Sequence, residues 1–209
     1  MDFMGSLRRI FSKLWELVSQ TVFPKSGLEK LIETLPAEAF LTRLPKIRYE
    51  REGVEAILPY REPRVRKFIE LIKYKGNAKA VSLGGYLLHE ATLSIFSERL
   101  LGRESKFILA GIPASKKRRR ERGFDQTEKL CQAIIEAGGG EFLEWRPKLL
   151  CRKKEAAAQT EIKSRKERLS NMKGVFAVTD GESVAGRTVV VIDDVTTTGA
   201  TLKAARRAL

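Results

Sequence analysis

Cysteine and histidine are scarce in this chain. Its 209 residues include two cysteines, Cys131 and Cys151, and a single histidine, and none of them form a pair at metal-ligand spacing. A disulfide framework and a zinc site of the common kinds are therefore excluded. We expect a protein of a reducing compartment, the cytoplasm, that holds no zinc.

Long apolar runs are missing as well. The first segment, residues 1–23, carries charges at Arg8, Arg9, Lys13 and Glu16. It therefore lacks the unbroken apolar core of a signal peptide or a membrane span, and we expect no membrane span. Its apolar residues between 7 and 18 recur at helical spacing, which predicts an amphipathic helix. Such a helix either docks on its own domain or binds a membrane surface or a partner.

Acidic residues are outnumbered by basic ones. The chain has 26 Asp and Glu against 40 Lys and Arg, which gives a formal net charge of +14. This balance favours anionic partners, namely phosphorylated small molecules, nucleic acid or an acidic protein surface, and it does not choose among them. With 43% hydrophobic residues, the chain can bury the core of one α/β domain.

The order of apolar patterns predicts a short helical appendage, residues 1–45, followed by one domain, residues 46–209. Short apolar runs predict strands, and a period near 3.6 residues predicts helices. The predicted strands cover 53–60, 106–113, 174–178 and 187–193, and the predicted helices cover 28–35, 64–75, 78–101, 124–137 and 199–209. Strands separated by helices indicate an α/β fold with a mostly parallel sheet flanked by helices.

The segment 189–201 reads VVVIDDVTTTGAT and carries the strongest chemical signal. Its aliphatic run is typical of a central parallel strand, so Asp193 and Asp194 are expected at the carboxyl end, where ligands bind in open α/β sheets. The polar turn that follows leads into a helix, whose backbone N–H groups and threonine hydroxyls can converge on a phosphate. The lysine of a P-loop is absent. Because two carboxylates repel a phosphate, we expect them to bind sugar hydroxyls or the water shell of Mg²⁺.

These residues resemble the phosphoribosyl-pyrophosphate (PRPP) motif of type I phosphoribosyltransferases, since aliphatics, two acids, a Thr-Gly pair and a final threonine occur in the same order. The resemblance implies a type I phosphoribosyltransferase-like fold in which Asp193 and Asp194 contact the ribose hydroxyls, with Mg²⁺ held through PRPP and water rather than by direct ligands. The implied PRPP-binding residues also include Val195, Thr196, Thr197, Thr198, Gly199, Ala200 and Thr201.

A narrower resemblance, over residues 47–209, is to the ComF family of competence-associated phosphoribosyltransferase-like proteins. It depends on FIELIKYKGN at 68–77, ILAGIPAS at 108–115, RRRERGFDQ at 118–126 and a series of Gln159, Arg168, Asn171 and Gly174. Three departures stand out. Asp125 replaces the asparagine commoner in the family, and the segment 22–36 has the flank of the family's N-terminal zinc module without its cysteines. The sequence also ends at Leu209, inside the helix expected after the motif, where the resemblance implies a further strand.

The family resemblance also implies roles for two further segments. Pro113, Ala114, Ser115 and Lys116 are expected in the loop that faces pyrophosphate. Lys117, Arg118, Arg119 and Arg120 either supply countercharge there or form a solvated, nucleic-acid-binding patch. The segment 152–171 corresponds to a mobile loop that closes over PRPP, with Arg165 and Arg168 as anion contacts, although an exposed helix explains its composition equally well.

Two functions of different classes follow. In the first, a glycosyltransferase-class enzyme binds PRPP with Mg²⁺ and transfers phosphoribose to a nucleophile with release of pyrophosphate, with catalytic roles for Asp193, Asp194, Arg165 and Arg168. In the second, a non-catalytic DNA-uptake accessory protein binds single-stranded DNA or a competence helicase. The basic clusters lack interleaved aromatic residues of a stacking platform. No general base is evident, so the acceptor stays open. The oligomeric state also stays open.

Overall fold

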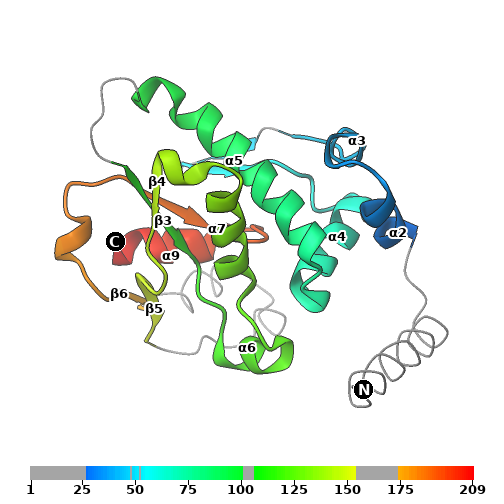
Figure 1. Cartoon of the computed structure of the whole chain (residues 1–209). Coiled ribbons are helices and arrows are strands. Elements are labelled where there is room, and N and C mark those ends of the chain that lie inside the picture. Colours follow the sequence, from blue (N-terminus) through cyan, green and yellow to red (C-terminus); the bar gives the residue numbers. More distant parts are fainter. Residues whose placement is uncertain (1–26, 48, 52, 101–105, 154–173) are drawn as a thin grey trace, which may run out of the picture.

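The computed structural model describes residues 27–47, 49–51, 53–100, 106–153 and 174–209. Its central feature is a parallel sheet in the order β4-β3-β7, formed by β4 (Leu143–Trp145), β3 (Phe107–Gly111) and β7 (Val189–Ile192) (Figure 1). Two small antiparallel pairs accompany it. They are β1 (Tyr49–Arg51) with β2 (Val54–Ala56), and β5 (Leu150–Arg152) with β6 (Phe176–Val178).

Helices pack around the parallel sheet, and they fall into two groups along the chain. Those before the sheet are α2 (Gly27–Thr34), α3 (Ala37–Leu41), α4 (Pro63–Glu70), the π-helical turn η1 (Leu71–Lys75) and α5 (Ala78–Leu100). Those that alternate with its strands are α6 (Lys116–Arg122), α7 (Gln126–Glu136), the short 3₁₀ turns η2 (Gly139–Glu141) and η3 (Glu182–Val184), and α9 (Ala200–Ala208). The expected α/β class and the flanked parallel sheet are confirmed.

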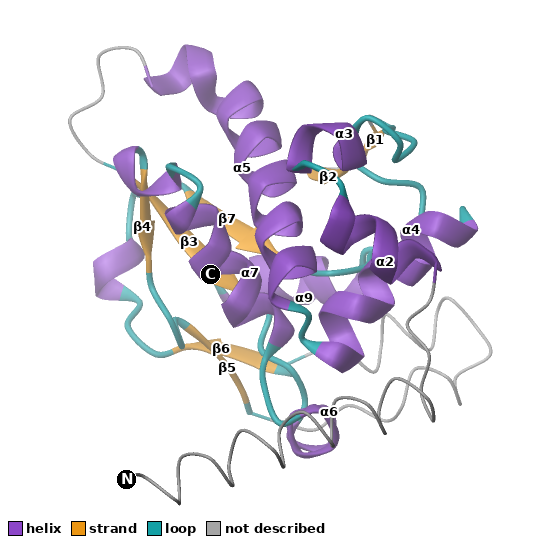
Figure 2. Ribbon diagram, turned by 45° about the vertical axis from the view of Figure 1, so that its right-hand side comes forward, coloured by secondary structure: helices purple, strands orange, loops and turns teal. Residues whose placement is uncertain are grey.

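Strand β3 is buried on both faces, as the apolar run 106–113 predicts. Phe107 and Leu109 join the core that includes α4, α5 and α7, whereas Ile108 and Ala110 pack with Leu149 on the opposite face. Alternate side chains of a strand point to opposite faces, so α4, α5 and α7 cover one face of β3, while Leu149 and Val184 of the turn η3 cover the other. Figure 2 shows α5 and α7 over one side of the sheet.

Two expectations about the sheet are wrong. Strand β6 pairs antiparallel with β5 and lies outside the parallel sheet. The link 179–188 between β6 and β7 explains this, because a parallel crossover needs a dozen or more residues and usually a helix. Strand β7 was expected to be central, but within the described ranges it pairs on one side only, with β3.

Helices α5 and α7 approach each other very closely at Gly85. A Cβ built on Gly85 would lie 2.4 Å from the Cβ of Ala133 and 2.6 Å from its backbone carbon. Only a residue without a side chain fits this contact. The small residues at the crossing therefore set the distance between the two helices that cover the sheet.

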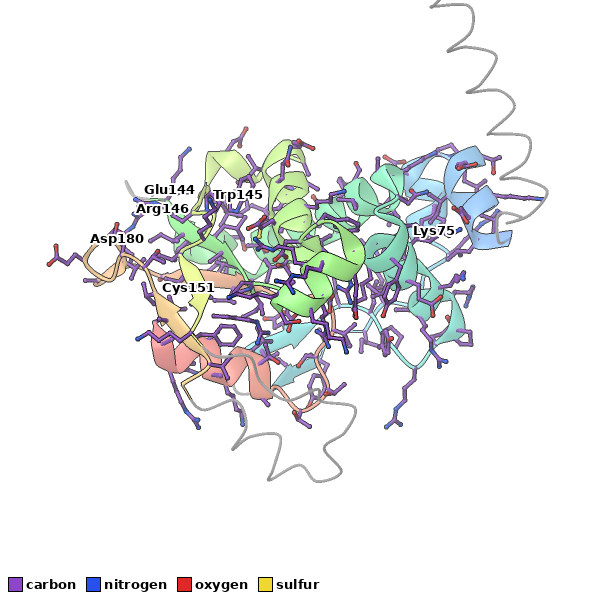
Figure 3. All side chains as sticks on the ribbon, turned by 90° about the horizontal axis from the view of Figure 1, so that it is seen from below. Lys75, Glu144, Trp145, Arg146, Cys151 and Asp180 are labelled. Carbon is purple, nitrogen blue, oxygen red and sulfur yellow. The ribbon has the colours of Figure 1, made fainter. Side chains whose placement is uncertain are left out.

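The described part of the predicted appendage shares its core with the rest of the fold. Ile32 of α2 and Phe40 of α3 are buried in the same apolar cluster as Phe68 of α4, with 5.7 Å between the Phe40 and Phe68 ring centroids. An ion pair of 2.6 Å joins Lys75 to Glu29 of α2. Figure 3 shows Lys75 on this side of the molecule.

An ion-pair cluster stabilises the amino-terminal side of the sheet. Glu144 of β4 is bound by Arg146 and by Arg187, which also donates to the backbone oxygen of Lys106 just before β3. Hydrogen bonds from Arg187 and Arg146 hold the pKa of Glu144 below its ordinary value. Figure 3 shows Glu144, Arg146 and Asp180 gathered on the side of the molecule away from Lys75.

None of the helices within the described ranges is both long enough and apolar enough to cross a membrane.

Candidate functional site

The carboxyl ends of β3 and β7 lie side by side. Gly111 is paired with Ile192 in the parallel register, and the N–H of Ile112 donates to the oxygen of Ile192 at 2.9 Å. The segment 113–116 and the acid pair that follows β7 therefore leave the sheet at the same edge, as the sequence predicts.

Each carboxylate oxygen of Asp194 contacts a side chain from another element. The Lys73 Nζ of η1 lies 3.0 Å from Oδ1, and the Nε2 of Gln126 donates to Oδ2 at 3.0 Å. Both charged side chains are largely shielded, with 15% of the Lys73 side chain and 9% of the Asp194 side chain exposed. Low exposure strengthens such a charge-assisted contact. The acid pair is thus tied to two helical segments, η1 and α7.

Asp193 is in a different electrostatic setting from its neighbour. Its Oδ1 accepts a hydrogen bond of 2.8 Å from the N–H of Asp194. Burial, and next the charge of Asp194, raise the pKa of Asp193 to about 7, while that hydrogen bond and the charges of Lys73 and Arg118 act in the opposite direction. A carboxyl group of this kind gains most from a ligand that supplies a hydroxyl donor or positive charge.

Gln126 supplies an unused acceptor at the same place. The residue is 3% exposed, and with its Nε2 bound to Asp194 its Oε1 is buried without a hydrogen-bond partner among the described residues. An unpaired buried acceptor is costly in a folded protein. A sugar hydroxyl, or a water molecule of a hydrated Mg²⁺ ion, is the kind of donor that would satisfy it, so the donor set fits the predicted ligand.

The threonine turn after the acid pair leads directly into α9. Gly199 precedes the helix with φ +70°, a left-handed conformation that favours glycine. The hydroxyl of Thr198 accepts from the N–H of Ala200 at 3.4 Å. The next N–H groups of the helix lie in its first turn, where backbone donors have no partner within the helix. The turn therefore presents donors to an anion.

A cavity of about 310 Å³ adjoins this turn. Thr196, Thr197, Thr198 and Gly199 line one wall, and Lys203 from the next turn of α9 also lines it. We call it the threonine-turn cavity. It combines hydroxyl groups, the start of a helix and a cation, which is the chemistry that binds a phosphate monoester.

A second cavity, of about 160 Å³, also has Thr196 in its lining. It is lined mostly by aliphatic side chains of α4, η1, α5 and β7, together with Asp193 and Asp194. We call it the apolar cavity. The two cavities share Ala56, Leu58 and Thr196 as lining residues, so they adjoin at the start of the turn.

The predicted pyrophosphate loop is held by Asp125. The carboxylate accepts from the N–H of Ala114 at 2.8 Å and from Arg119 at 3.1 Å, and it caps α7 through the N–H and hydroxyl of Thr127 at 3.1 and 2.7 Å. Burial by itself raises the pKa of Asp125, but the hydrogen bonds from Ala114, Thr127 and Arg119 outweigh burial and hold the pKa below its ordinary value. The aspartate at this position therefore has a structural reason, a charged contact with Arg119.

The basic run after this loop is helical rather than extended. Ser115 caps α6 by accepting from the N–H of Arg118 at 3.2 Å, so Lys116 begins a helix instead of continuing the loop. Arg118 contributes charge at Asp193, whereas Arg119 pairs with Asp125 and Glu128. Lys117 and Arg120 are exposed. Arg118 and Arg119 are exposed as well, so the whole run faces solvent while these two side chains also support the site.

Several predicted features lie outside the described residues. They are the amphipathic helix within 1–23, most of the predicted mobile loop 152–171, and the candidate anion contacts Arg165 and Arg168. Within the described part of the chain, no cluster of three or more His, Cys, Asp or Glu side chains could hold a metal ion directly.

Sequence reasoning misses three residues of the site, Lys73, Gln126 and Lys203. Lys73 belongs to the quoted FIELIKYKGN segment, but no local pattern indicates that its ammonium group reaches an acid more than a hundred residues later. Lys203 could have been found, because a residue four positions after Gly199 lies one helical turn further along α9.

No family model matches the chain. Among curated proteins, the chain is similar to the competence protein ComFC of Streptococcus pneumoniae, with 32% identity over 164 residues that cover 76% of this chain and 64% of the relative. It is also similar to the DNA utilization protein YhgH of Escherichia coli K12, with 27% identity over 184 residues that cover 88% of this chain and 75% of the relative. The chain thus spans 64% of the length of the pneumococcal relative. These matches support a relationship to one family.

Proposed function

We propose that this chain, a relative of the ComF-family proteins, binds PRPP together with Mg²⁺ at the carboxyl edge of its parallel sheet. The observation that carries the proposal is the continuity of Asp193, Asp194 and the turn 196–199. They follow one strand without interruption and line two adjoining cavities. A ligand with a phosphate at one end and a sugar diol next to it matches this order of groups.

Each part of PRPP has a set of groups suited to it. The turn 196–199, the first N–H groups of α9 and Lys203 suit the 5′-phosphate. Asp193 and the unpaired Oε1 of Gln126 suit the ribose hydroxyls, which donate hydrogen bonds. Mg²⁺, held through PRPP and water, would neutralise negative charge on the pyrophosphate.

Transfer of the phosphoribosyl group is the second part of the proposal. A nucleophile would form a bond to the anomeric carbon as the bond from that carbon to pyrophosphate breaks, and the leaving pyrophosphate would take the electron pair. Asp193 and Asp194 would favour positive charge developing on the sugar, and Arg118 would favour departure of the anion. Arg165 and Arg168 remain predicted contacts of the closing loop.

Calorimetric titration with PRPP tests the binding. We expect binding in the presence of Mg²⁺ and none after the metal is removed. Asp193→Asn and Asp194→Asn should each weaken it by about 1 to 3 kcal/mol, the usual scale for a charged hydrogen bond. Asp180→Asn is the control, because the Asp180 side chain is 57% exposed and lines neither cavity. Equal PRPP affinity in wild type and both site variants would refute the assignment.

A second candidate function, DNA binding, is favoured by one surface. Tyr74 of η1 is 66% exposed, and the Arg122 guanidinium lies 5.0 Å from its ring centroid. Nearby in sequence, the Lys129 ammonium lies 4.0 Å from the ring centroid of Phe124. The fold thus brings aromatic rings to the basic segment that lacks them in sequence, and paired rings and cations suit single-stranded nucleic acid. The names of the relatives, a competence protein and a DNA utilization protein, support this candidate.

Fluorescence anisotropy with a labelled oligonucleotide tests the second candidate. Replacing Lys117, Arg118, Arg119 and Arg120 with Ser should flatten the decline of affinity with salt, because fewer counterions are released. Tyr74→Ser should weaken binding of single-stranded DNA by about 1 to 3 kcal/mol if its ring stacks on a base. Lys30→Ser, an exposed change on α2, is the control. No DNA binding even at low salt would remove this candidate.

A further inference from the structure

The apolar cavity has walls of a consistent kind. Its aliphatic lining includes Ile69 of α4, Ile72 of η1, Leu87 and Leu88 of α5, Val191 of β7 and Leu202 of α9. Burial in such a cavity favours an apolar ring or chain over a hydrated group. The lining alone therefore specifies the body of a ligand.

The position of the apolar cavity relates it to the proposed PRPP site. It shares Thr196 with the threonine-turn cavity, and Asp193 and Asp194 are among its lining residues. If the phosphate lies at the threonine turn and the ribose at the two carboxylates, the apolar cavity is the next space along the same edge. A molecule seated in it can direct one end toward the sugar.

The charges that line the apolar cavity are all of one sign. Glu55, Asp193 and Asp194 contribute carboxylates, Tyr60 and Thr196 contribute hydroxyl groups, and no Lys or Arg is among its described lining residues. Lys73 is nearby but is bound to Asp194. An anionic ligand would be repelled here, whereas an N–H donor finds carboxylate acceptors.

The size of the apolar cavity limits the ligand further. Its volume is about 160 Å³. An engineered cavity of about 150 Å³ in another protein binds benzene. The apolar cavity is therefore large enough for one six-membered ring with a small substituent.

We propose that the apolar cavity binds the acceptor for phosphoribosyl transfer, and that this acceptor is a single-ring compound with an amino group and no carboxylate or phosphate. The role of this ligand as an acceptor rests on the proposed function. Its chemical class depends only on the lining and size of the cavity. In the transfer, the amine nitrogen supplies the electron pair for the new bond to the anomeric carbon, pyrophosphate leaves with the pair of the broken bond, and the amine loses one proton to water.

Aniline is the probe for the cavity, since it has one ring and a neutral amino group at pH 8. Ligand-observed NMR should detect aniline binding to the full chain without PRPP. Benzoate, which has a similar size but a negative charge, should bind at least about tenfold more weakly, because its charge would face carboxylates and the nearby Lys73 is already bound to Asp194. Toluene should fall between them. Benzoate affinity equal to that of aniline would overturn the proposed ligand class.

A variant that fills the apolar cavity, together with a control on the same helix, tests whether aniline binds there. Leu88→Phe places a larger side chain on a wall of the apolar cavity and should reduce aniline affinity at least about tenfold. Leu93→Phe, an exposed position on the same helix that does not line the cavity, should leave the affinity unchanged within about twofold. Circular dichroism and the thermal midpoint report whether each variant is folded. Unchanged aniline affinity in folded Leu88→Phe would place the binding elsewhere and overturn the inference.

The last comparison separates this inference from the proposed function. In protein saturated with PRPP and Mg²⁺, aniline should still bind, because acceptor and donor must occupy the edge together. Loss of aniline binding under these conditions would overturn the acceptor role. If PRPP does not bind but aniline does, the proposed function fails while the apolar cavity stands as a site for a small ring amine.

Discussion

Lys73 and Asp194 form an ion pair of 3.0 Å that joins the π-helical turn η1 to the end of β7. The other carboxylate oxygen of Asp194 accepts a hydrogen bond from Gln126 of α7. Two segments that are distant in sequence are therefore fixed to the acid pair before any ligand binds. The consequence for Asp193 is electrostatic, because Lys73 is one of the charges that oppose the rise of its pKa.

Lys73→Met should raise the pKa of Asp193 further above about 7, since a charge that favours the carboxylate is removed. Binding of PRPP with Mg²⁺ should then require a higher pH than in wild type. Calorimetric affinities measured from pH 6 to pH 9 give the midpoint. Lys75→Met is the control, because Lys75 pairs with Glu29 instead. The same midpoint in Lys73→Met and wild type would contradict this electrostatic role.

Asp193→Asn should stabilise the fold at pH 8. The pKa of Asp193 is about 7 in the folded protein against an ordinary value of 3.8, so the folded state keeps a proton that the unfolded chain releases. Stability linked to this group is present below pH 3.8 and is lost as pH rises through about 7. At pH 8 the variant should gain at least about 1 kcal/mol in the free energy of unfolding. Urea unfolding at pH 8 and pH 4 checks it, and a variant less stable than wild type at pH 8 would refute the prediction.

Asp125→Asn should destabilise the fold at neutral pH by about 1 to 3 kcal/mol, because a charged hydrogen bond to Arg119 is lost. The folded pKa of Asp125 lies below its ordinary value of 3.8, so its contribution is present above pH 3.8 and is lost as pH falls through the folded value. The difference between variant and wild type should shrink in acid. Denaturant unfolding at pH 7 and pH 3 tests this, with Glu38→Gln at an exposed position as control. A difference that grows in acid would contradict it.

Gly85→Ala should cost about 1 to 3 kcal/mol of stability, the scale of overpacking in a core. The added methyl group would meet the Cβ and backbone of Ala133 at 2.4 and 2.6 Å, and backbone cannot rotate away. Gly181→Ala is the matched control, since no atom lies within 4 Å of a Cβ there. Thermal unfolding of both variants gives the comparison, and equal midpoints would show that α5 and α7 can separate at this crossing without cost.

The strands and helices with strong local patterns were predictable from sequence. The run 106–113 was identified as a buried strand and is β3, and the helix predicted to end at Gly76 does end there, at η1. The pairing of the strands was harder to predict from the sequence. The antiparallel partner of β6 depends on residues 150–152, whose three-residue strand is too short to produce an alternating pattern.

The candidate site was predictable to the extent that it follows one strand. The positions of Asp193, Asp194 and the turn 196–199 at the sheet edge follow from a parallel strand and the helix after it. The contacts of Lys73 and Gln126 with Asp194 depend on how η1 and α7 pack, which no local pattern encodes. Tyr74 beside Arg122 is a second case, since a stacking surface absent from the sequence pattern is assembled by tertiary packing.

Two neighbouring residues at the start of α7, Asp125 and Gln126, contact two different segments of the sheet edge. Asp125 holds the backbone of Ala114 in the segment after β3, and Gln126 holds Asp194 after β7. A displacement of either segment must strain the same short piece of helix. If PRPP binds as proposed, the segment expected at its pyrophosphate and the acid pair expected at its ribose are mechanically linked through this helix start, so that the two halves of the ligand would be sensed together.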